Sequence, residues 1–209
     1  MEGIAYAETG STVTAPATPD SGFQTREKGF ALETGLSLHI GANPLSSLPT
    51  NGSSGTALTG GLFGGYKHRR LIIGLGLQLG GAVGSADSTA TVVVLIAGPG
   101  VRVTLFQSSD RKLEVAGQVD LGVGHTFGSS GAQQPGVLGS SVAQDDIRVL
   151  AALGPAIRYW VHPQLALVSS ILLRLDYVHV NTRYPGGTEL TSNRYDLNFS
   201  VGLGLLAVM

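Results

Sequence analysis

The sequence predicts an all-β fold, a transmembrane antiparallel up-and-down β-barrel, on three observations. Charged residues make up only 13% of the 209 residues and the mean hydropathy is +0.23, whereas soluble domains carry roughly 25% charge. No run approaches the ~18 consecutive apolar residues that a membrane-spanning helix needs. Long segments alternate instead between apolar residues and small or polar ones, which is the period of a β-strand.

The segment Leu71 to Val83 shows this alternation most clearly. Its odd positions carry Leu71, Ile73, Leu75, Leu77 and Leu79, and its even positions carry Gly74, Gly76 and Gln78. A strand turns successive side chains to opposite faces, so one face is a row of large apolar groups and the other is small or polar. We expect the first face to contact lipid and the second to line the barrel lumen.

Seven further segments show the same pattern, which predicts eight strands in all. The stretch Phe30 to Gly41 alternates over its full length and suits the ~9 to 11 residues that cross a bilayer at a steep tilt. Within Thr89 to Phe106 the run TVVVLIA is apolar on both faces, so its parity is ambiguous. The predicted strands cover residues 30–41, 56–66, 71–83, 89–106, 113–123, 146–161, 165–180 and 195–209.

The predicted connections alternate between long and short. Long polar loops are expected at 43–55, 128–145 and 181–193, and short turns at 67–70, 107–111 and 162–164. Bacterial outer-membrane barrels have this asymmetry, with short periplasmic turns and longer extracellular loops. Ten strands would remain possible if the loop at 128–145 or the N-terminal residues also paired.

Residues 1–28 are rich in Ser, Thr, Ala, Gly and Pro and show no sustained period, which predicts a flexible N-terminal tail on the periplasmic side. The barrel domain would then occupy residues 29–209. Met1 is followed by Glu2 without a basic and apolar leader, so we expect a natural precursor to begin upstream. Aromatic residues gather toward both ends of the strands and predict two interfacial girdles, made of Phe30, Tyr66, Phe106, Tyr159 and Trp160 at the short-turn end and of Tyr177 and Tyr195 at the other.

A Gly-Pro pair occurs twice in equivalent places, at Gly98-Pro99 and Gly154-Pro155. Proline has no N–H to donate to a ladder, and a closed barrel has no free edge that would tolerate it. We therefore predict a bulge or a locally broken hydrogen bond at Pro99 and at Pro155.

The lumen-facing parity collects charged side chains, which predicts a polar network that fills the interior. Buried charges are tolerable only when they are paired and hydrogen-bonded, and Arg102 with Glu114, across one turn, is the pair expected first. We expect one layer near the short turns, containing Glu33, Arg102, Glu114 and Arg158, and another nearer the loops, containing Asp120, Arg174, Asp176 and Asp196. An eight-stranded interior is too narrow for an open channel, so this network predicts a plugged lumen, with a narrow gated pore for small solutes as the alternative.

No catalytic, cofactor-binding or metal-binding residues are predicted. The nearest approach to the sites of outer-membrane lipid A-modifying enzymes is at the top of one predicted strand, which carries Asp176, His179 and Asn181, with Ser192 across the loop. The His-x-Ser order of the deacylases is absent there. The net charge of −1 and the pI of about 6.5 give no basis for nucleic-acid binding. The absence of cysteine is compatible with an oxidising compartment.

Residues 29–209, with their alternating strands, short turns and a final strand that reaches the C-terminus, resemble the small outer-membrane barrels of the OmpA, OmpX and opacity-protein type. The resemblance implies a bacterial outer-membrane location among phospholipid and lipopolysaccharide. It also implies a non-catalytic anchoring or surface-interaction role through the extracellular loops, with an extracellular or periplasmic protein as a possible partner. The chain departs from these proteins by ending in Ala207-Val208-Met209 rather than in an aromatic residue.

A soluble lipocalin-like barrel that binds a ligand is the main alternative fold. Such a barrel would turn its polar face outward, and an exterior of glycine and alanine with sparse charge would not suit water.

Overall fold

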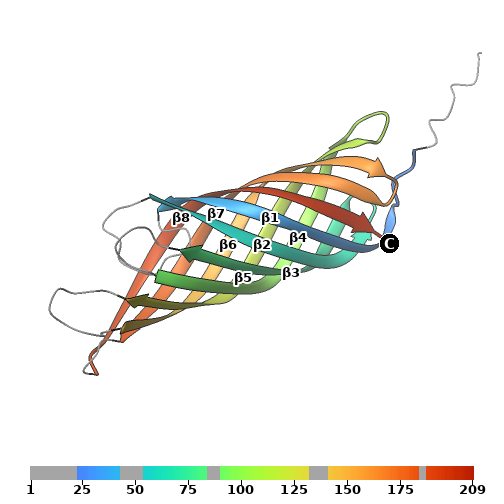
Figure 1. The fold of residues 1–209 in the computed structure, drawn as a ribbon. Coiled ribbons are helices and arrows are strands. Elements are labelled where there is room, and N and C mark those ends of the chain that lie inside the picture. The colour runs from blue at the N-terminus through green and yellow to red at the C-terminus, as the bar shows by residue number, and fades with distance from the viewer. Residues whose placement is uncertain (1–22, 43–53, 84–89, 132–140, 184–186) are drawn as a thin grey trace, which may run out of the picture.

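The computed structural model describes residues 23–42, 54–83, 90–131, 141–183 and 187–209. Eight antiparallel strands form a single closed barrel in which each strand pairs with its neighbours in sequence and β1 pairs with β8 (Figure 1). The predicted fold class is confirmed. No helix among the described residues is long and apolar enough to cross a membrane. The strands are β1 (Lys28–Ala42), β2 (Ser54–His68), β3 (Leu71–Val83), β4 (Ala90–Gln107), β5 (Leu113–Gly131), β6 (Ser141–His162), β7 (Leu165–Arg183) and β8 (Glu189–Val208).

The connections follow the predicted asymmetry at one end and depart from it at the other. The three short turns separate β2 from β3, β4 from β5 and β6 from β7. Half of the loop predicted at 128–145 is instead strand, because β5 continues to Gly131 and β6 begins at Ser141, and the other half lies outside the described residues. The loop predicted at 181–193 is corrected in the same way, since β7 reaches Arg183 and β8 begins at Glu189. These polar residues extend existing strands and add none, and the loop predicted at 43–55 lies mostly outside the described residues.

The register fixes how strongly the strands tilt. The chain of paired residues that starts at Ala31 passes through Gly65, Gly74, Gly100, Asp120, Ala152, Arg174 and Asn198 and returns to β1 at Gly41. One circuit therefore shifts the register from Ala31 to Gly41. With standard strand spacing and rise, this shear gives a tilt of about 40° and a backbone radius of about 8 Å. Side chains fill a barrel of that radius.

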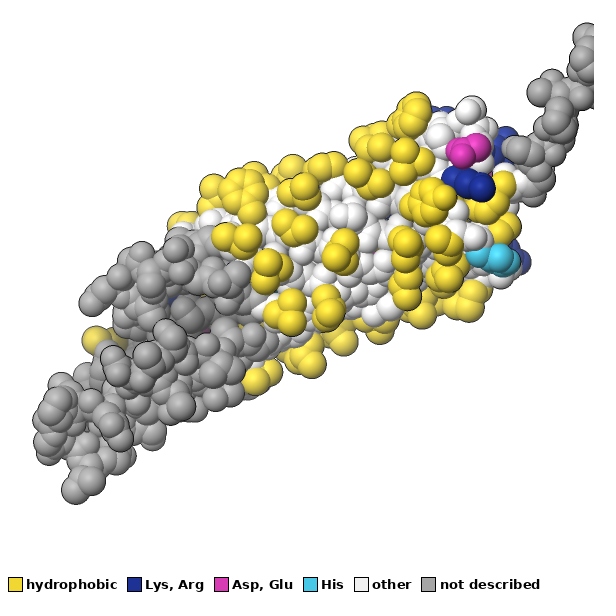
Figure 2. Space-filling view, turned by 45° about the horizontal axis from the view of Figure 1, so that its top comes forward, with side chains coloured by type: hydrophobic (Ala, Val, Ile, Leu, Met, Phe, Trp, Pro, Cys, Tyr) yellow, Lys and Arg dark blue, Asp and Glu magenta, His cyan; other side chains and the backbone are white. Residues whose placement is uncertain are grey.

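The outer surface is an apolar belt, as the parity predicts. Leu75, Leu203 and Leu121 are 69%, 68% and 52% exposed. Figure 2 shows apolar side chains around the middle of the barrel on the face in view, with charged groups toward the end near the N-terminal segment. Phe30, Tyr66 and Tyr159 also face outward, at the short-turn end. The prediction that Trp160 belongs to that girdle is wrong, because Trp160 is only 1% exposed and faces the lumen. Successive residues of a strand point to opposite faces, and the preceding Tyr159 points outward.

The prediction for the two prolines is confirmed. The β4–β5 ladder skips Gly98 and Pro99, and the β6–β7 ladder skips Gly154 and Pro155, while the register on both sides of each gap stays the same. Each gap is therefore a local loss of hydrogen bonding rather than a bulge. True bulges follow further along the same two strands, between Thr104 and Phe106 and between Trp160 and His162.

Candidate functional site

The lumen holds the predicted polar residues and is the candidate site. Six of the eight predicted residues are buried there, and Glu33 and Asp120 are partly buried. The structure sorts the charged side chains of the interior into two networks. The lower network, toward the short turns, consists of Glu33, Arg102, Glu114, Asp120 and Arg158. The upper network, toward the long connections, consists of Asp146, Arg148, Arg174, Asp176, Arg194 and Asp196.

Arg102 is the centre of the lower network. Its Nη1 donates to Asp120 Oδ1, its Nε lies 3.7 Å from Glu33 Oε2, and its guanidinium stacks on the Phe63 ring at 4.0 Å. Gln118 donates a further 2.6 Å hydrogen bond to Asp120. A single guanidinium thus contacts two carboxylates contributed by strands on different sides of the barrel.

The expected pairing of Arg102 with Glu114 is wrong. Arg102 is opposite Gln118 on β5, so Glu114 lies further toward the turn, where it is opposite Gln107. Glu114 instead pairs with Arg158 at 3.8 Å and accepts a 3.1 Å hydrogen bond from Gln107. The assignment of Asp120 to the loop-side layer is corrected too, because its partner is Arg102 of the lower network.

The upper network is organised by Arg174. Its Nε and Nη2 both reach the carboxylate of Asp176 at 2.7 Å, and the same carboxylate accepts a 3.3 Å hydrogen bond from Asn198. Asp196 accepts a 2.9 Å bond from Arg194. Two-point contacts of the kind that Arg174 makes hold both groups in one orientation.

Sequence reasoning missed Asp146, Arg148 and Arg194. Arg148 donates a 2.7 Å hydrogen bond to Thr126 and lies 3.9 Å from Asp146. Asp146 and Arg148 lie within the strand predicted at 146–161 and share the even-numbered parity of Arg158, so applying that parity to the whole strand would have found them.

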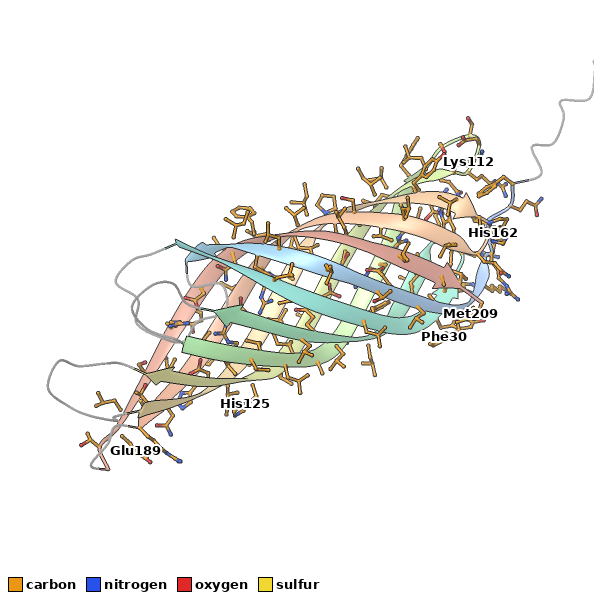
Figure 3. The ribbon with its side chains drawn as sticks, in the orientation of Figure 1. Phe30, Lys112, His125, His162, Glu189 and Met209 are labelled. Carbon is orange, nitrogen blue, oxygen red and sulfur yellow. The ribbon has the colours of Figure 1, made fainter. Side chains whose placement is uncertain are left out.

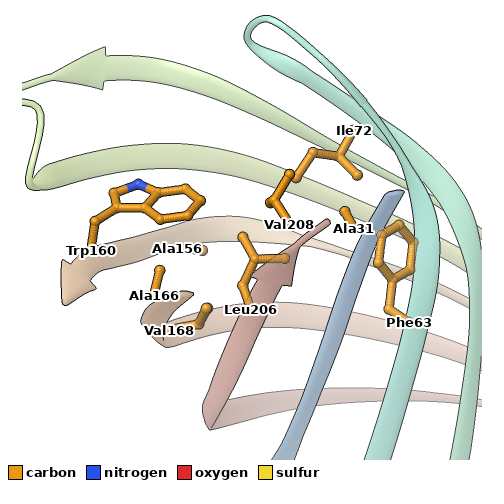
Figure 4. Packing of buried hydrophobic residues seen from close by; sticks show 9 residues of the cluster. All are labelled: Ala31, Phe63, Ile72, Ala156, Trp160, Ala166, Val168, Leu206 and Val208. Carbon is orange, nitrogen blue, oxygen red and sulfur yellow. The ribbon is translucent and has the colours of Figure 1, made fainter. Parts of the chain in front are cut away.

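Apolar clusters also occupy the interior, which the prediction of a polar lumen did not include. One cluster lies at the short-turn end, where Trp160 and Leu206 point into the barrel (Figure 4). A second lies further along β4, β6 and β7 and comprises Val94, Ile96, Leu150, Ala152 and Leu172. The first cluster's other members are Ala31, Phe63, Ile72, Ala156, Ala166, Val168 and Val208. A barrel of this radius requires close packing inside, and aliphatic side chains provide it without needing polar partners.

A small cavity of about 90 Å³ remains inside the barrel. Arg102 and Asp120 of the lower network line it, as does Gln78, which lies 3.4 Å from Arg174 of the upper network. Its walls include Gly61 and Gly76, which have no side chain to fill the space. The volume would hold about three water molecules, and polar groups face it. The interior is therefore a stack of ion pairs and apolar layers around one small polar chamber.

The residues nearest to a catalytic arrangement do not come together. Asp176 turns into the lumen and is held by Arg174, whereas His179 has the opposite parity and shares a 2.7 Å hydrogen bond with Asn193. Within the described ranges no group of three acidic or histidine side chains could hold a metal ion. His39, buried in the lumen, contacts Thr59 at 2.7 Å.

The fold has counterparts among solved structures. Neisserial surface protein A is 13% identical, with 87% of this chain and 97% of that chain covered and a TM-score of 0.55. A major outer membrane protein of Thermus thermophilus is 12% identical, with 88% and 100% covered and a TM-score of 0.56. The outer membrane protein OprG of Pseudomonas aeruginosa is 12% identical, with 90% and 99% covered and a TM-score of 0.53.

This chain folds as a small eight-stranded outer-membrane β-barrel. No family model and no curated protein matches the sequence. The lipid-facing belt and this fold together are those of an integral protein of the bacterial outer membrane. The short turns accordingly mark the periplasmic end.

Proposed function

We propose that this outer-membrane barrel has a closed lumen and acts at the cell surface through its extracellular hairpins. One observation carries the proposal. The pairing of β8 with β1 ends at Asn198 opposite Gly41, yet β8 extends to Glu189 and, within the described residues, pairs there with β7 alone. The β7–β8 hairpin therefore projects beyond the closed part of the barrel (Figure 1).

The projecting hairpin has the character of a contact surface. Leu190 and Tyr195 are among its most exposed side chains, and one edge of its outer part has no described strand beside it. An open strand edge can accept a further strand, and exposed apolar side chains add affinity. This supports a surface-interaction role with an extracellular protein, in a setting where lipopolysaccharide surrounds the barrel on that side.

Closure of the lumen is supported by its contents. A solute would have to separate Arg102 from Asp120 and Arg174 from Asp176, and also displace the apolar cluster that contains Trp160. Breaking one buried ion pair costs about 3 to 5 kcal/mol. We therefore propose that the barrel is a non-catalytic membrane anchor that does not conduct solutes. We also propose that the N-terminal tail extends into the periplasm.

Two measurements on the full chain test the proposal. In planar bilayers the wild type should show no stepwise conductance, while Arg102→Glu, which sets three carboxylates together, should open current. Bacteria that express Leu190→Ser/Tyr195→Ser should attach to surfaces and to one another several-fold less than the wild type, with Leu203→Ala as the lipid-facing control. Conductance of the wild type would favour the gated pore. A change in the mass of lipid A from expressing cells would favour an enzyme. Equal attachment by all variants would contradict the surface role.

A further inference from the structure

The periplasmic mouth of the barrel contains a pocket that the surface function does not use. It has a volume of about 620 Å³, which lies within the size range of small-molecule sites. Lys67 and Arg69 line it together with Arg70 and Arg111, against the carboxylates of Glu27 and Glu114, a formal excess of two positive charges. Thr25, Thr104 and Gln107 complete the wall.

Pairing of the basic residues differs sharply between this mouth and the rest of the barrel. In the lumen and at the extracellular end every described arginine has a carboxylate within ion-pair distance: Arg102, Arg148, Arg158, Arg174, Arg183 and Arg194. Within the described part of the chain, none of the four basic residues in the pocket has such a partner. Glu114, the pocket's inner carboxylate, is instead paired with Arg158.

Lys67 is the most informative of the four. Its side chain is buried, with 3% of the residue exposed, and its ammonium lies 4.6 Å from the centre of the Trp160 ring. Glu27 and Glu114 line the same pocket, but neither lies within ion-pair distance of the ammonium. A buried ion without a counter-ion in contact is unfavourable unless a ligand supplies one. The ring contributes a modest attraction and leaves the ammonium able to bind an anion.

Two of the arginines occupy backbone conformations that favour glycine. Arg69 has φ of 55° and Arg111 has φ of 58°, and they are the non-glycine residues with positive φ in the described structure. Each conformation costs roughly 1 to 2 kcal/mol for a residue with a Cβ. The Arg69 backbone is held in place by its N–H, which donates a 2.6 Å bond to Glu27 O. Long basic side chains thus stand at the positions where a turn would most easily accept glycine.

We propose that the periplasmic mouth binds a phosphate group, carried by an anionic phospholipid of the inner leaflet or by a free phosphate compound. Guanidinium groups form two-point, charge-assisted hydrogen bonds with phosphate, and the excess of positive charge favours an anion. The mouth lies at the membrane surface, at the end of the barrel where Figure 3 shows Lys112, His162, Phe30 and Met209. Inner-leaflet phosphates would lie at the same depth.

The decisive variant is Arg69→Gly/Arg111→Gly. Glycine accepts the positive φ of both turns, so this variant removes two guanidiniums while the fold should persist, as a heat-modifiable gel shift would show. Arg183→Gln, at the extracellular end, is the matched control. In the first measurement, full-length protein in nanodiscs of neutral lipid is titrated with inorganic phosphate and glycerol phosphate. In the second, native mass spectrometry compares how much phosphatidylglycerol and how much phosphatidylcholine the protein retains.

We expect wild type and Arg183→Gln to bind alike and the glycine double variant to bind at least about tenfold more weakly. Selective retention of phosphatidylglycerol identifies the lipid as the source, and binding of the soluble phosphates without lipid selectivity identifies a free compound. Equal binding by the double variant overturns the proposal. Preference for polyglutamate over every phosphate probe also overturns it, in favour of an acidic protein partner.

Discussion

A single methyl group at Gly154 should discriminate between the two kinds of inward-facing glycine in this barrel. Gly154 lies where the β6–β7 ladder is interrupted, and β7 approaches it closely. A Cβ built there would lie 3.0 Å from Leu172 Cα and closer still to the carbonyl oxygen of Ile171. These are backbone atoms, which cannot rotate aside. At Gly61, in contrast, the nearest atom to such a Cβ is Leu77 O at 4.0 Å.

The expected magnitudes follow from these contacts. Gly154→Ala adds volume where none is free, and overpacking of that kind costs about 1 to 3 kcal/mol. Gly61→Ala adds the same methyl group beside the central cavity without a clash, and it reduces the freedom of the unfolded chain, which stabilises by about 0.4 to 1 kcal/mol. The two variants should therefore differ by roughly 1.5 to 4 kcal/mol in the free energy of unfolding, although the chemical change is identical.

Reversible urea unfolding in liposomes, followed by the heat-modifiable gel shift, measures this difference. Gly154→Ala should unfold at a lower urea concentration than the wild type, and Gly61→Ala at an equal or higher one. If Gly154→Ala were as stable as Gly61→Ala, the close approach of β6 and β7 would be incorrect.

Three further predictions concern the faces of the barrel. Brominated lipids should quench the fluorescence of wild-type Trp160 weakly, because its ring lies in the lumen. They should strongly quench the tryptophan of Tyr159→Trp/Trp160→Phe, which faces outward. The reverse order would show that the parity of β6 is misassigned. Leu203→Arg, in the middle of the belt, should destabilise the barrel by about 2 to 4 kcal/mol. Leu190→Arg, on the projecting part of the same strand, should cost at most about 1 kcal/mol. Equal urea midpoints for the two variants would contradict the proposed membrane boundary. Asp120→Asn should destabilise by about 3 kcal/mol because it leaves Arg102 with only the longer contact to Glu33, and an unchanged midpoint would show that this pair is hydrated.

The sequence by itself determined the fold and the two faces of the barrel. Side-chain direction along a strand has a period of two residues and is therefore local, so Leu75 and Leu121 could be placed outside, and Glu114 and Arg174 inside, without any knowledge of their neighbours. The short turns and the prolines at the ladder gaps could be predicted for the same reason, since each depends on a few consecutive residues.

Only the tertiary structure decided which of these residues meet. The register shift of one circuit, from Ala31 to Gly41, determines which residues of neighbouring strands are opposite one another. It also determines which side chains lie at the same level across the lumen. That shift pairs Arg102 with Asp120 rather than with Glu114. It also brings the four basic residues of the periplasmic mouth around one pocket, although Lys67 belongs to β2 and Arg111 to the turn between β4 and β5. Parity fixes the face of a side chain, while its partner depends on the closure of the whole barrel.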